Sequence, residues 1–144
     1  LSFDAVDDAL TFGGTLTNSR HVFIALRTAA LPFNPALQEI FGDGGMLVRL
    51  EDDTADVDLG FGVSSSYSLD CGALTGPGFS FDETIAGGSG SIILRTTFAG
   101  AQTVAGGHVG NTTFEGQIAE VMVFDNTPAA GDLTNICSYL NTKH

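Results

Sequence analysis

Short apolar stretches with a period of two recur along the chain, separated by clusters of Gly, Pro, Asn and Ser. Because successive side chains of a strand point to opposite faces of a sheet, this pattern predicts many short antiparallel strands rather than alternating strands and helices. Nineteen glycines among 144 residues suit the turns and bulges that such strands require. The predicted strands are residues 1–3, 9–12, 21–27, 46–50, 57–61, 67–71, 91–97 and 114–124.

Two of these segments, 21–26 and 118–124, are apolar at almost every position. A strand of that kind is covered on both of its faces. The sequence therefore predicts an all-β sandwich of two sheets. The length of 144 residues predicts a single domain. Because the chain begins with Leu1 and not with Met, we expect it to be a processed chain or a part of a longer protein.

One helix is expected at the C-terminus. Thr127 is a suitable N-cap and Pro128 suits the first helical position. Lys143 and His144 fall at the other end, where the helix dipole favours positive charge. An apolar stripe follows the helical period at Leu133, Ile136, Cys137 and Leu140. Packing this stripe against the sandwich would cover apolar surface, so the helix is expected to complete the fold.

Charge excludes two classes of partner. Five basic residues stand against seventeen acidic ones, which gives a formal net charge of −12. Such a chain lacks the basic patch that drives binding to nucleic acid or to anionic lipid. No apolar run approaches the roughly 20 residues of a membrane span, so no membrane insertion is expected.

Two cysteines, Cys71 and Cys137, are separated by 66 residues, which is not a metal-ligand spacing. They could form a disulfide in an oxidising compartment or remain two buried free thiols. The sequence leaves both alternatives open.

Both ends of the chain carry a family pattern. The segment FEGQIAEVMVFD at 114–125, followed by a turn and a helix ending SYLNTK at 138–143, resembles the closing segment of laminin-G-like domains of the concanavalin A-like lectin/glucanase superfamily. The opening LSFDAVDDAL at 1–10 is similar to the start of these domains. The resemblance implies a two-sheet antiparallel jelly roll with a short C-terminal α-helix. The chain departs from the family pattern at Ala5 and Ala9, and it has no Trp.

Two acidic clusters are candidate calcium sites, because carboxylate oxygens are the ligands that calcium prefers. One consists of Asp4, Asp7 and Asp8, and the other of Asp53, Asp56 and Asp58 within the acidic run 51–58. For the first cluster the alternative is a turn in which aspartates accept hydrogen bonds from nearby amides. For the second the alternative is a solvated hairpin turn.

Catalysis is not expected. Glu51, Asp53 and Asp56 come close to the E-x-D-x-x-E strand motif of glucanases with this jelly roll, but the third position is Asp. The acidic Glu120 lies within an apolar strand and must face solvent or find a partner such as an arginine.

The sequence predicts a non-catalytic binding or adhesion module of an extracellular, cell-surface or virion protein, with a glycan or a partner surface as ligand. The alternative is a structural subunit of a virion decoration or tail, a filament or a surface layer, which assembles with copies of itself or with other subunits. A glycoside hydrolase is the least favoured hypothesis. The two aspartate clusters predict that calcium stabilises the fold.

Overall fold

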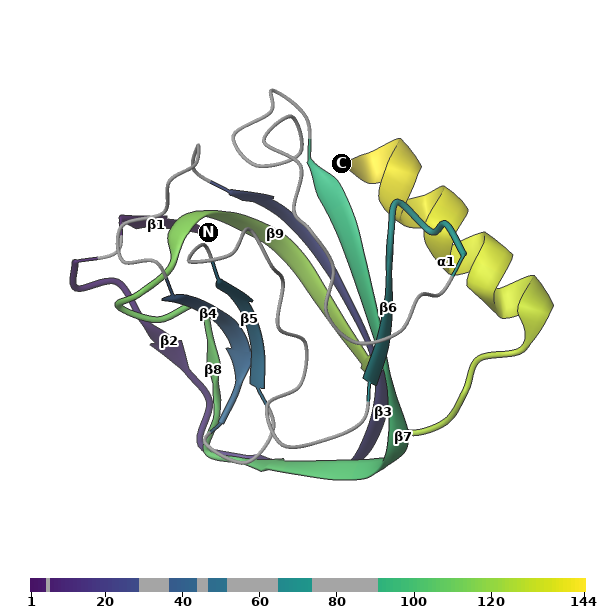
Figure 1. The fold of residues 1–144 in the computed structure, drawn as a ribbon, viewed down its shortest axis with the longest axis horizontal. Coiled ribbons are helices and arrows are strands. Elements are labelled where there is room, and N and C mark those ends of the chain that lie inside the picture. The colour runs from purple at the N-terminus through teal and green to yellow at the C-terminus, as the bar shows by residue number, and fades with distance from the viewer. Residues whose placement is uncertain (5, 29–36, 44–46, 52–64, 74–90) are drawn as a thin grey trace.

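The computed structural model describes residues 1–4, 6–28, 37–43, 47–51, 65–73 and 91–144. In these residues the chain is mostly β, with two antiparallel sheets and a C-terminal helix (Figure 1). The prediction of an all-β chain with two antiparallel sheets and a short terminal helix is therefore confirmed.

The larger sheet has five strands in the order β1-β9-β3-β7-β6. In that order the strands are Ser2–Asp4, Glu115–Phe124, Thr15–Thr28, Ile92–Ala105 and Ser65–Leu69. The smaller sheet has the order β2-β8-β4-β5. Its strands are Leu10–Thr11, His108–Val109, Leu37–Gly42 and Leu47–Glu51. In each sheet a strand from the N-terminal part of the chain pairs with a strand from the C-terminal part. These pairs are β1 with β9 and β2 with β8.

The main core lies on one face of the five-stranded sheet. Val22, Ile24 and Leu26 of β3 point into this core together with Leu94 and Phe98 of β7. The core also contains residues of β4 and β5, so it joins the two sheets. Its further members are Phe3, Ile40, Phe41, Val48, Ile92, Val104, Phe114 and Ile118.

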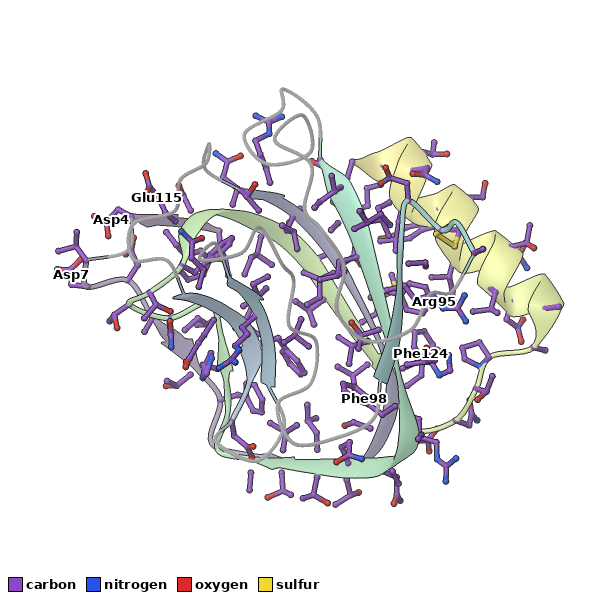
Figure 2. All side chains as sticks on the ribbon, viewed as in Figure 1. Asp4, Asp7, Arg95, Phe98, Glu115 and Phe124 are labelled. Atoms are coloured by element: carbon purple, nitrogen blue, oxygen red, sulfur yellow. A yellow bond between two sulfur atoms is a disulfide. The ribbon has the colours of Figure 1, made fainter. Side chains whose placement is uncertain are left out.

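The opposite face of the five-stranded sheet is covered by α1, Ala130–Lys143 (Figure 1). Phe23, Ala25 and Ile93 are buried there against Leu140, and the other residues of the predicted stripe, Leu133, Ile136 and Cys137, pack against the same cluster. Figure 2 shows Phe98 and Phe124 on the two sides of this sheet, Phe124 on the helix side. Two covered faces explain why 21–26 is apolar at almost every position. No helix formed by the described residues has the length and apolar character that a membrane span requires.

A disulfide fastens α1 to the sheet. Cys71, in the turn after β6, is bonded to Cys137 of α1 with a Cα–Cα distance of 6.0 Å. Of the two alternatives that the sequence left open, the structure contains the disulfide. It links elements 66 residues apart, so it closes a long loop.

The helix begins later than predicted. Ala129 is the N-cap residue, without a side-chain hydrogen bond, and the first helical residue is Ala130. The prediction of Thr127 as N-cap and Pro128 at the first helical position is therefore wrong. The pairing of β9 with β3 extends to Phe124, and the intervening residues connect the sheet to the helix that lies over it.

Strands β4 and β8 were not predicted, and β3 and β7 are longer than the sequence pattern indicated. Each of these two long strands has 14 residues, and the register of their pairing shifts on either side of Ser19. The predicted strand 57–61 lies outside the described residues.

Candidate functional site

Three aspartates come together between β1 and β2. Asp4, Asp7 and Asp8 can each place one carboxylate oxygen so that all three lie within 4.8 Å of one another. We call this group the acidic triad. Asp4 and Asp7 are exposed and lie at the edge of the molecule remote from α1 (Figure 2). Hard oxygen donors of this kind suit calcium or magnesium rather than zinc or copper.

Carboxylates of the triad also accept hydrogen bonds from backbone amides of the turn in which they lie. The Val6 amide donates to Asp4 Oδ1 at 3.0 Å, and the Asp4 amide donates to Asp8 Oδ2 at 3.2 Å. The first of these is an aspartate bonding the backbone two residues on. Each of these carboxylates has a second oxygen, so turn formation and cation binding are compatible.

Buried aromatic side chains pack next to the acidic triad. Phe3, next to Asp4, is buried and meets Phe114 edge-on with ring centroids 5.6 Å apart. Gly110 approaches the Phe3 ring so closely that a Cβ there would lie 2.4 Å from Cε1, and its φ is +62°. A residue other than glycine would be strained at this position, so Gly110 allows the segment between β8 and β9 to lie under β1.

A second polar group is built from β4, from β8 and from the segment that follows β8. Asn111 Nδ2 donates to Glu39 Oε2, and His108 Nε2 lies 3.5 Å from the same oxygen. Thr113 Oγ1 accepts the Glu39 amide at 2.9 Å and donates to Asn111 Oδ1 at 2.6 Å. We call these four residues the Glu39 cluster. It was not predicted, because the irregular pattern around β4 gave no strand there; the polar triplet 111–113 was the available signal.

Strand pairing brings the Glu39 cluster and the acidic triad to the same edge of the molecule. Leu10 pairs with Val109, two residues before Asn111, and Asp8 lies two residues before Leu10. Asp4 pairs with Glu115, and Figure 2 shows these two at the same edge. This edge therefore combines exposed carboxylates with half-buried donors and acceptors that are held in fixed positions. Such a surface can bind a cation and form directional hydrogen bonds to a polar ligand.

Burial lowers the pKa of His108, while the charges of Glu39 and Asp43 oppose this change. The imidazole is 16% exposed, so desolvation disfavours its charged form. The half-buried His108 lies in β8, which pairs with both β2 and β4, and its imidazole faces Glu39.

The other predicted residues are not part of this edge. Asp53, Asp56 and Asp58 lie outside the described residues, and so does the side chain of Glu51. Glu120 has partners, which was one of the two predicted alternatives, but they are not arginines. Its carboxylate accepts hydrogen bonds from His144, Lys143 and Tyr139 of the C-terminal segment, not from an arginine. The bonds from His144 and Lys143 lower the pKa of Glu120. Glu120 therefore anchors the end of α1.

His21 is a buried polar residue under the helix side of the five-stranded sheet. It is 2% exposed, and Arg95 Nη2 lies 3.3 Å from its Nε2. Because a guanidinium only donates, Nε2 accepts and the proton of neutral His21 lies on Nδ1. Burial, with a smaller contribution from the Arg95 charge, lowers the pKa of His21 from 6.5 to about 4.

Stability is expected to fall as the pH decreases from 6.5 towards 4. In this range the unfolded chain protonates His21 and the folded chain does not, so the loss reaches about 3 kcal/mol at pH 4. The measurement is the free energy of unfolding across this range for the wild type and for His21→Gln. Carboxylates titrate in both proteins, so the difference between the two curves isolates His21. Parallel curves would contradict the assignment.

The chain was compared with protein families, curated proteins and solved structures, and no match was found in any of the three.

Proposed function

We propose that the chain is a non-catalytic binding or adhesion module that holds a glycan or a partner surface at the edge formed by the acidic triad and the Glu39 cluster. The jelly-roll topology of concanavalin A-like domains belongs to this proposal, as does calcium as the bound ion. The observation that carries it is the convergence of three carboxylates within 4.8 Å at an exposed edge.

The adjacent Glu39 cluster supports the same function. Glu39, Asn111 and Thr113 are half-buried and bonded to one another, so their orientation is fixed before a ligand arrives. Fixed donors and acceptors reduce the entropy lost on binding. A calcium ion on the triad would add a positive charge to a strongly acidic surface. Hydroxyls or carboxylates of a ligand could then coordinate this ion.

Calcium is expected to raise the melting temperature. An ion that binds only the folded state stabilises it by about 2.7 kcal/mol at 100 times its Kd. The measurement compares melting in calcium chloride with melting in chelator. Asp7→Asn should abolish the difference, because it removes a ligand and leaves the Asp4 and Asp8 turn bonds in place.

The matched control is Asp125→Asn, which removes an exposed carboxylate between β9 and α1. This variant should keep the calcium effect. Equal melting temperatures of the wild type in calcium and in chelator would contradict the calcium site.

Ligand binding is tested separately by electrophoresis through gels that contain neutral glucans, galactomannans or uronate polymers, with calcium and with chelator. Retardation by one polysaccharide that Asp7→Asn abolishes supports the proposal. Calcium-dependent melting without any retardation would leave the ion site in place and favour a protein surface as ligand.

A structural subunit is the second candidate, and exposed apolar side chains favour it. Val6 is 73% exposed and Leu10 46%, and both lie near strands at sheet edges. Exposed apolar residues beside unpaired strand edges are typical of surfaces that pair with another chain. This candidate predicts assembly that increases with concentration and that Val6→Asp weakens, measured by sedimentation equilibrium. A monomer at all concentrations would exclude self-assembly.

For location we propose the extracellular space, a cell surface or a virion. The disulfide between Cys71 and Cys137 supports this, because disulfides persist in oxidising compartments.

A further inference from the structure

Three polar side chains from neighbouring strands lie on the helix side of the five-stranded sheet. Arg95 of β7 pairs with Phe23 of β3 on one side and with Ser68 of β6 on the other. His21 lies two residues before Phe23, on the same face of β3. Figure 2 shows Arg95 on the side that carries α1. His21 and Ser68 are each 2% exposed, whereas Arg95 is half-buried and reaches solvent.

Within the part of the chain that the structure describes, these residues carry hydrogen-bonding atoms that are buried without a partner. The atoms are Nδ1 of His21, Nε of Arg95 and Oγ of Ser68. Because His21 Nε2 accepts from Arg95, His21 Nδ1 is an N–H donor, as is Arg95 Nε. The group therefore offers two N–H donors and a hydroxyl. Burying donors without acceptors is costly, so an acceptor here would stabilise the folded chain.

The positive charge of Arg95 is not compensated by the residues that surround it in the described part of the chain. Its guanidinium contacts the Phe23 ring, 5.8 Å from the ring centroid, and the neutral His21. Among the residues that the structure describes, no carboxylate forms an ion pair with Arg95. Desolvation by burial lowers the pKa of the Arg95 guanidinium.

We propose that Arg95, His21 and Ser68 form a binding site for a small oxyanion, a carboxylate or a sulfate carried by a ligand or present in solution. An oxyanion brings negative charge and only acceptor oxygens, which complement a guanidinium and unpartnered donors. This site lies on the helix side of the five-stranded sheet, apart from the acidic triad, and does not depend on the function proposed for that edge.

The test is an NMR titration of the intact, isotope-labelled chain. Sodium sulfate, sodium acetate and sodium glucuronate are compared with sodium chloride at one ionic strength of about 0.15 M, where screening over about 8 Å weakens repulsion by the net negative charge. The expected result is a saturable shift of the Arg95 Nε–H and His21 resonances with at least one oxyanion and not with chloride. Sulfate alone or the carboxylates alone would identify the group that the site accepts. Shifts that are the same in all four salts would overturn the proposal.

Variants locate the binding. Arg95→Lys keeps the charge but loses the Nε–H donor and should weaken binding by about tenfold, the loss of a charge-assisted hydrogen bond. Ser68→Ala, a small change that keeps the strand, should weaken it by about threefold. The control is Arg20→Gln, which removes an exposed arginine of β3, the strand that carries His21, and should leave binding unchanged. Saturable binding that neither Arg95→Lys nor Ser68→Ala weakens would also overturn the proposal.

Discussion

Replacing Cys71 and Cys137 by serine is expected to lower the free energy of unfolding by about 4 kcal/mol. A disulfide removes conformations from the unfolded chain, and on the chain-entropy model the effect grows with the length of the closed loop. Here the bonded residues are 66 positions apart. The measurement is denaturant unfolding of the wild type and of the double variant under oxidising conditions.

Reduction provides the control for the disulfide. A reductant should destabilise the wild type by the same amount and should have no effect on the double serine variant. Loss of the disulfide should also weaken the attachment of α1 to the sheet, because Leu140 is the only residue of α1 that is fully buried. Equal unfolding midpoints for the wild type and the double variant would show that the cross-link does not contribute to stability.

Replacing Phe114 by alanine is expected to cost about 3–5 kcal/mol, the range for deleting a buried aromatic side chain. Phe114 is completely buried and packs edge-on against Phe3, the residue that precedes Asp4 of the acidic triad. The loss combines the transfer of the ring to water with the cavity that it leaves. The measurement is the shift of the denaturant midpoint at unchanged slope.

Phe114→Leu is the matched variant, because it keeps most of the apolar volume and should cost less than about 1.5 kcal/mol. Weaker calcium binding in Phe114→Ala than in Phe114→Leu is also expected, since Phe3 precedes Asp4 and positions it. A cost below about 1 kcal/mol for the alanine variant would show that the Phe3–Phe114 contact does not hold this end of the sandwich.

Local patterns predicted the elements whose periodicity is uninterrupted. The strands around 21–27, 91–97 and 114–124 were predicted because apolar residues alternate or fill almost every position of a short run, and the stripe of α1 was predicted from its period of 3.6 residues. The short strands β4 and β8 were missed. Each depends on partners supplied from elsewhere, since β8 is held between β2 and β4. The two residues of β8 are too few to give a periodic signal.

The candidate site was predicted only in part. Asp4, Asp7 and Asp8 are close in sequence, so a turn brings them together and their clustering was visible in the chain. The contact of Glu39 with Asn111 spans 72 positions. No local signal indicates such a pair, because it is set by the registers of β4 and β8.

Composition and periodicity by themselves determined that the chain is acidic, rich in strands and closed by an amphipathic helix, since charge and hydrophobic period are properties of neighbouring residues. Tertiary structure decided which faces meet. It joined Cys71 to Cys137, gave Glu120 its partners at the end of α1 and placed Arg95 beside His21. The physical reason is that strand order and register bring distant segments together, and a shift of one residue would turn every side chain to the other face.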